Sequence, residues 1–187
     1  MTQEEVVGLV VDALERLGAV YMVAGSFASN FHGVPRMTQD ADLVVDLDEA
    51  GALRLVRALE QEFYVTEEAA REAVRLRRLF NAIHLATGFK VDIVIKKDRA
   101  FSDEELARRM TGQLAGRPTR FASAEDTILA KLEWSRDAAS DRQYADAQGV
   151  MSVQGASLDW GYLERWADDL GVSELLDRAR RGQPPAR

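Results

Sequence analysis

The spacing of apolar and polar residues predicts an N-terminal half in which strands and helices alternate. Residues 3–17 carry apolar side chains at helical spacing, and Gly18 follows as a stop signal. Short apolar runs predict strands at 19–24, 42–47, 63–66, 82–87 and 89–95. Amphipathic runs predict further helices at 49–61 and 67–78. We therefore predict an α+β fold, a mixed sheet flanked by helices.

Beyond residue 98 the pattern becomes mostly helical. The stretch "DEELARRM" predicts a helix and "TRFA" a short strand, and Ser123 is placed to cap a helix over 124–138. Further helices are expected near 140–151, 159–169 and 172–181, and the tail 182–187 is expected to be disordered. These patterns divide the chain into an α/β core, residues 1–98, and a helical part, residues 99–187.

Composition narrows the chemistry that the chain can perform. None of its 187 residues is cysteine, which excludes a thiol nucleophile, a cysteine-ligated zinc and a disulfide framework. The net charge of −7 argues against broad, non-specific binding of nucleic acid. No 18-residue apolar run is present and the N-terminus is too acidic for a signal peptide, so we expect a cytoplasmic protein without a membrane span.

Three aspartates occupy strands that would otherwise be apolar. Asp40 and Asp42 are two residues apart where a strand begins, so alternation places both side chains on one face. Asp92 interrupts the apolar run "FKVDIVI", which predicts that it is buried or lies in a cleft. Carboxylates that close repel each other unless a cation neutralises them, and Mg²⁺ prefers such oxygen ligands. The pattern favours a shared magnesium site.

A strand ending in Gly25-Ser26 supplies a second element of the same chemistry. Glycine allows the backbone to approach a ligand, and the N-terminus of a following helix presents free N–H groups to phosphate. Each feature alone has an ordinary explanation as a turn, a cap or a paired acid. Asp46 and Asp48 form a second Asp-x-Asp, but turn and capping roles explain them. The ordered combination points to nucleotide chemistry.

At these residues the sequence resembles the nucleotidyltransferase superfamily, the polymerase-β-like fold. The matching segments are "YMVAGS", then thirteen residues (27–39), "DADLVVD" and later "KVDIVI", with Ala24 where a first glycine is more common. The segments "ASAEDTILAKLEWSR" and "SDRQYADAQGVM" resemble the AbiEii/AbiGii-type toxin nucleotidyltransferases and their minimal relatives. By motif position they supply Lys131, Arg142 and Asp146.

The resemblance implies a Mg²⁺-dependent transfer of a nucleoside monophosphate from a nucleoside triphosphate to an acceptor hydroxyl. Asp40, Asp42 and Asp92 would hold two Mg²⁺ ions and perform catalysis, and Gly25, Ser26, Lys131, Arg142 and Asp146 would bind the nucleotide. The acceptor could be tRNA or other RNA, a protein or a small molecule of the aminoglycoside kind, and an antitoxin partner would fit the toxin reading. A non-catalytic binding module with the same fold is the alternative.

For three residues, a structural role is an alternative to a role in the nucleotide site. Lys131 could extend along its helix to solvent, and Asp146 could pair with Arg142, four residues earlier on the same face. Arg36, which precedes the acids, could orient them or the nucleotide, or could serve only its loop.

Overall fold

The computed structural model describes residues 1–185, which form two compact units. The first, here the sheet unit, comprises residues 1–24 and 38–121. The second, the helical unit, comprises residues 25–37 and the chain from residue 122 onward. The chain passes between them at residues 24, 37 and 121, so neither unit is one continuous segment.

The sheet unit is built on a seven-stranded mixed sheet in the order β3-β4-β5-β2-β1-β7-β6. Its strands are β1 (Val20–Ala24), β2 (Asp40–Asp46), β3 (Phe63–Tyr64), β4 (Leu79–His84), β5 (Lys90–Ile95), β6 (Met110–Leu114) and β7 (Arg117–Phe121). β2 runs parallel to β5 and β1 runs parallel to β7, whereas the other neighbours are antiparallel. This sheet, together with the helices, confirms the predicted α+β class.

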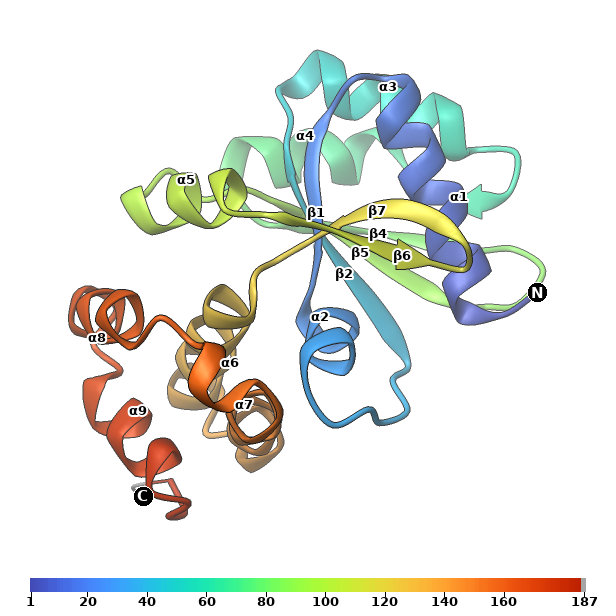
Figure 1. The fold of residues 1–187 in the computed structure, drawn as a ribbon. Helices are drawn as coiled ribbons and strands as arrows, with labels where there is room; N and C mark the ends of the chain where they lie inside the picture. The colour runs from blue at the N-terminus through green and yellow to red at the C-terminus, as the bar shows by residue number, and fades with distance from the viewer. Residues whose placement is uncertain (186–187) are drawn as a thin grey trace. The chain divides into compact units, whose positions relative to one another are not determined.

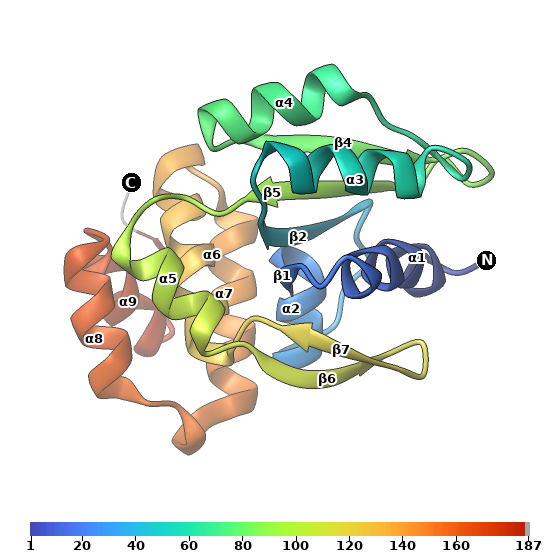
Figure 2. The ribbon, with the colours of Figure 1, turned by 90° about the horizontal axis from the view of Figure 1, so that it is seen from above.

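Helices cover one face of this sheet. Figures 1 and 2 show α1 (Gln3–Arg16), α3 (Glu49–Leu59) and α4 (Glu67–Leu76) on the same side of the strands, while α5 (Ala100–Ala107) follows β5. Asp48 begins α3 as predicted, because its Oδ1 accepts a hydrogen bond from the Gly51 N–H at 2.7 Å. On β2 and β5 the residues Ala41, Leu43, Val91 and Ile93 are fully buried. The face opposite these residues is the one that carries the acids.

The helical unit contains α2 (Gly25–His32), α6 (Ala124–Ala138), α7 (Asp141–Gln154), the short helix η1 (Gly155–Ser157), α8 (Trp160–Asp169) and α9 (Ser173–Arg180). Ser123 caps α6 as predicted, since its Oγ accepts from the Asp126 N–H at 3.1 Å. The buried Asp126 also accepts from Tyr162 at 2.5 Å, which ties α6 to α8. α2 packs against both α6 and α7.

The structure differs from the expected elements after residue 98. α5 ends at Ala107, and Met110 already belongs to β6, a strand that the pattern did not predict because Thr111, Gly112 and Gln113 are small or polar. β6 and β7 extend the sheet by a hairpin, so the sheet unit reaches residue 121 rather than 98. None of the helices within residues 1–185 combines the length and the apolar character that a membrane crossing requires.

The tail that we expected to be disordered falls partly outside the described residues, at 186 and 187. In the part that is described, the backbone carbonyl of Gln183 accepts hydrogen bonds from Tyr144 at 3.0 Å and from Gln148 at 3.2 Å. The carbonyl of Pro184 accepts from Arg178 at 2.8 Å.

Candidate active site

The register of two parallel strands places the three predicted acids on one face of the sheet unit. Asp42 on β2 lies directly beside Asp92 on β5, and Asp40 lies beside Lys90. Side chains of neighbouring residues in a parallel register point to the same face, so these four share a surface. Asp92 is 6% exposed, as its apolar surroundings predicted, whereas the side chain of Asp40 is 41% exposed.

Lys90 connects two of the acids. Its Nζ donates to Asp92 Oδ2 at 2.9 Å and lies 3.5 Å from Asp40 Oδ2. One ammonium group within reach of both carboxylates shows that their oxygens turn toward a common point. The hydrogen bond to Asp92 is the main influence that raises the pKa of Lys90, against an opposing effect of burial. Asn81 on β4 donates to the other oxygen of Asp92 at 2.5 Å.

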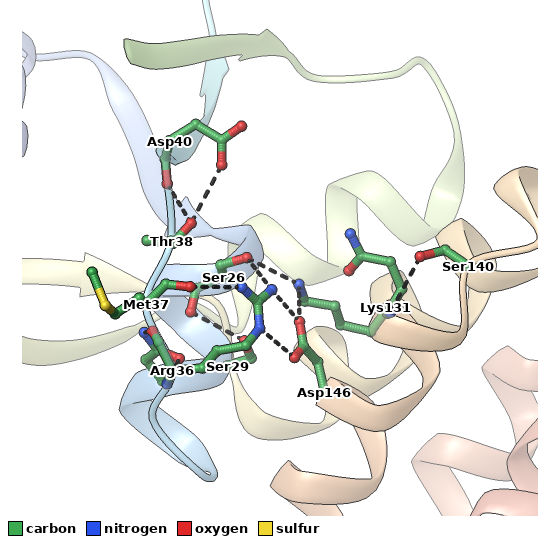
Figure 3. Close-up of polar contacts among 11 residues, drawn as sticks. Ser26, Ser29, Arg36, Met37, Thr38, Asp40, Lys131, Ser140 and Asp146 are labelled. Atoms are coloured by element: carbon green, nitrogen blue, oxygen red, sulfur yellow. Dashed lines mark hydrogen bonds and ion pairs between the residues drawn. The ribbon is translucent and has the colours of Figure 1, made fainter. Parts of the chain in front are cut away.

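Thr38 fixes the entrance to β2. Its hydroxyl donates to the backbone carbonyl of Asp40 at 2.9 Å and lies 3.4 Å from the carboxylate Oδ1 of the same residue (Figure 3). The Thr38 carbonyl accepts from the Gln3 side chain at 2.9 Å. Hydrogen bonds of the Thr38 hydroxyl and of the Thr38 carbonyl therefore fix the backbone that leads to Asp40.

The donor set of these strands fits a hard divalent cation in its chemistry. Asp40, Asp42 and Asp92 offer carboxylate oxygens, the ligands that Mg²⁺ prefers, and they already attract a cationic ammonium group. In residues 1–185, however, no three acidic or histidine side chains are grouped closely enough to hold a metal ion as they stand. A metal would therefore require these carboxylates to exchange their present partners for the ion.

The second cluster belongs to the helical unit and begins with Gly25. Gly25 is the first residue of α2 and has a φ of +55°, a left-handed backbone that glycine adopts without steric cost. Ser26 therefore lies within the first turn of α2 and not ahead of the helix. Its hydroxyl accepts a hydrogen bond from Arg36 Nη2 at 2.8 Å and lies 3.5 Å from Lys131 Nζ.

Arg36 and Lys131 meet on the carboxylate of Asp146 (Figure 3). Arg36 donates through Nε and Nη2 to the two Asp146 oxygens, both at 2.7 Å, and Lys131 Nζ donates to Oδ2 at 2.8 Å. The contact is bidentate, because two N–H groups of the planar guanidinium donate to the two carboxylate oxygens. Gly33 allows the loop that carries Arg36 to approach α7, since a Cβ there would lie 2.8 Å from the Val150 nitrogen.

In this cluster the side chains of Lys131 and Asp146 are buried, whereas that of Arg36 is 25% exposed, and the formal charges do not cancel. Lys131 is 3% exposed, so the expected extension to solvent is wrong. Burial raises the pKa of Asp146, but the hydrogen bonds from Arg36 and Lys131 outweigh it, and the pKa is lowered. Among these three side chains two cations share one anion, so their formal charges sum to +1 beside the Ser26 hydroxyl. Such a surplus favours an anion.

The other predicted residues stand apart from these two clusters. Arg142 is exposed on α7, and Asp146 pairs with Arg36 and Lys131 rather than with Arg142 as expected from their spacing. Asp46 is exposed as the last residue of β2 and is paired in register with Val20, so it lies in the strand rather than in the expected turn. Sequence reasoning left the role of Arg36 open and gave none to Lys90 or Asn81. The register of β4 against β5 joins Asn81 to Asp92, whereas Lys90 precedes Asp92 by two residues on β5, a spacing that places both on one face.

The arrangement of strands and helices is the nucleotidyltransferase fold. The antibiotic-resistance factor ANT(2'')-Ia superposes with a TM-score of 0.60 at 17% sequence identity, over 94% of this chain and 97% of that protein. An antigenic nucleotidyltransferase-like protein from Paracoccidioides brasiliensis gives a TM-score of 0.58 at 15% identity, over 98% and 94%. The lincosamide antibiotic adenylyltransferase LnuA gives 0.54 at 14% identity, over 82% and 98%.

The sequence itself matches no protein-family model and no curated protein. The likeness is therefore one of fold, and it agrees with the superfamily resemblance of the motifs. The resemblance to the AbiEii/AbiGii group stays a prediction.

Proposed function

We propose that the protein is a nucleotidyltransferase that moves a nucleoside monophosphate from a nucleoside triphosphate to an acceptor hydroxyl. The observation that carries the proposal is the register of Asp42 beside Asp92, with Asp40 on the same face, in a chain that has the nucleotidyltransferase fold. Asp92 comes from a part of the sequence separate from Asp40 and Asp42, and a strand that only had to fold would gain nothing from burying Asp92.

The acids of the sheet unit would bind divalent cations, and one of them would accept the proton of the acceptor hydroxyl. Asp40, Asp42 and Asp92 would hold Mg²⁺, which when bound supplies positive charge for the α-phosphate and for the leaving pyrophosphate. The acceptor oxygen forms a bond to the α-phosphorus while the bond from that phosphorus to the pyrophosphate oxygen breaks. Asp92 is the residue we assign to accept the hydroxyl proton, as a buried carboxylate on the face shared by all three acids.

The helical unit carries donors that suit the phosphates of a nucleotide. The Ser26 hydroxyl and the first N–H groups of α2 suit phosphate oxygens, and α2 has no acidic residue in its first turn to oppose an anion. Arg36 and Lys131 add the surplus positive charge described above, and Asp146 holds both in place. Arg142 remains a candidate nucleotide contact from its exposed position on α7.

A small-molecule hydroxyl is the acceptor that the fold likeness favours. ANT(2'')-Ia is an antibiotic-resistance factor that has been crystallised in complex with adenylyl-2''-tobramycin, and LnuA is a lincosamide adenylyltransferase with lincomycin bound. Both align with nearly their whole length. An RNA or protein acceptor and an antitoxin partner stay predictions from the resemblance of the second half.

The test uses nucleoside triphosphates labelled at the α-phosphate, offered one at a time with Mg²⁺. Aminoglycosides and lincosamides, total RNA and the protein itself serve as acceptors in parallel reactions. We expect label on a small molecule, and chelation of the metal with EDTA should abolish it. Label on RNA or protein would retain the enzyme class and change the acceptor. Absence of transfer and of binding for all four nucleotides would favour the non-catalytic module.

A further inference from the structure

Lys90 lies on the same face of the sheet as the three acids and contacts two of them. Its position beside Asp40 in the β2–β5 register puts its side chain on the face that carries Asp42 and Asp92. Its Nζ reaches Asp92 Oδ2 at 2.9 Å and Asp40 Oδ2 at 3.5 Å, and Asn81 donates to Asp92 Oδ1. Both oxygens of Asp92 therefore have a donor of this chain already.

We propose that Lys90 is the internal counter-cation of the acid cluster, which a divalent cation must displace from Asp92, so that Lys90 sets the affinity of the chain for metal. The inference rests on the proposed function, because it takes Asp40, Asp42 and Asp92 as the metal ligands. An ammonium group and a divalent cation are drawn to the same carboxylate oxygens for the same electrostatic reason. They compete for Asp92 Oδ2, and the positive charge of Lys90 opposes the arrival of a second cation.

The arrangement of the cluster supports this exchange. With Lys90 in contact, no three acidic groups in residues 1–185 are arranged to hold a metal. The side chain of Lys90 is 38% exposed, so its ammonium group can turn to solvent while its backbone stays paired in β5. Asp92, by contrast, is buried and cannot leave the face of the sheet. The mobile partner of the pair is the lysine.

The competition has a second consequence for the protein without metal. Three carboxylates on one face repel each other, and Lys90 relieves that repulsion for two of them. Removal of its charge should therefore weaken the folded chain when metal is absent and strengthen metal binding when metal is added. A lysine with a purely structural role would produce the first effect alone.

The experiment is calorimetric titration of the full chain with Mn²⁺ alone, without nucleotide. For Lys90→Gln we expect Mn²⁺ to bind about tenfold more tightly than to the unchanged protein, in the range typical of coupled binding events. Lys90→Arg keeps the positive charge and should not tighten binding. Lys96→Gln removes the same charge from a lysine that pairs with Asp103, and should bind Mn²⁺ as the unchanged protein does.

Thermal unfolding of the same variants supplies a readout that does not depend on calorimetry. Lys90→Gln should melt below the unchanged protein without metal and recover the difference with Mn²⁺. Equal or weaker Mn²⁺ binding by folded Lys90→Gln would overturn the role of Lys90 while leaving the metal site in place. Failure of both folded proteins to bind Mn²⁺ would overturn the inference together with the metal site of the proposed function.

Discussion

The sheet unit and the helical unit each contain a cluster of aspartate and basic side chains, and the two clusters are unbalanced in opposite directions. On the sheet, Asp40, Asp42 and Asp92 share a face with one lysine, Lys90. In the helical unit, Arg36 and Lys131 share the single carboxylate of Asp146. The sheet cluster has an excess of negative charge, and the helical cluster has an excess of positive charge.

The difference shows that aspartate and basic side chains can favour ligands of opposite charge, depending on which charge is in excess. Aspartates in excess favour a divalent cation, and basic groups in excess favour an anion such as phosphate. Exposure differs too, since Lys90 and Asp40 are partly open to solvent whereas the side chains of Lys131 and Asp146 are 4% and 8% exposed. This difference supports the proposed exchange of the cation at the sheet cluster, whereas Lys131 and Asp146 are held by burial.

The largest expected effect is on catalysis by the sheet cluster. Asp42→Asn removes a carboxylate charge with little change in shape, and we expect nucleotidyl transfer to fall at least about a hundredfold because the charge stabilisation of the reaction is lost. Asp46→Asn at the exposed end of the same strand is the matched control and should retain activity. Transfer of α-labelled nucleotide measures both. Equal activity of the two variants would remove Asp42 from the active site.

A large effect on stability is expected in the helical cluster. Asp146→Ala leaves Arg36 and Lys131 without their shared carboxylate, and loss of one member of a buried ion pair typically costs about 3 kcal/mol of unfolding free energy. Asp141→Ala, an exposed acid in the first turn of the same helix, should cost about 1 kcal/mol or less. Denaturant unfolding compares them. Similar losses for both variants would mean that the cluster does not stabilise the fold.

The smallest expected effect is on the free energy of unfolding at acidic pH. Because the folded pKa of Asp146 is lowered, its stabilising contribution is complete above the ordinary aspartate pKa, about 3.9, and is lost as the pH falls below it. The raised pKa of Lys90 acts in the opposite window, with its contribution lost only as the pH rises above about 10.4. The stability difference between the unchanged protein and Asp146→Asn should shrink between pH 5 and pH 3. A constant difference would contradict the assigned charge of Asp146.

The elements that position the site were predictable because they follow local rules. Apolar alternation placed Asp40 and Asp42 on one face, and the apolar neighbours of Asp92 predicted its burial. The contacts of Asn81 with Asp92 and of Lys90 with Asp40 were not predictable, because strand pairing creates them. The contact of Lys90 with Asp92, two residues later on the same strand, follows from alternation and was overlooked.

Contacts across long stretches of chain account for the remaining differences. Arg36 reaches Asp146 across 110 residues, and no spacing rule connects a loop arginine to a helix so distant in sequence. The strand β6 was missed because its polar residues carry no apolar alternation, and its pairing with β7 defines it instead.

The chain passes between the two units three times, which limits the fragments into which the polypeptide can be divided. A fragment ending at residue 98 would lack the hairpin that completes the sheet beside β1, and it would retain α2 without the helices against which α2 packs. A fragment ending at residue 121 would contain the whole sheet unit but would also carry residues 25–37 of the helical unit, so no single truncation yields either unit alone. Separate tests of the two clusters will require point substitutions in the whole polypeptide, or a circular permutant that rejoins the segments of one unit.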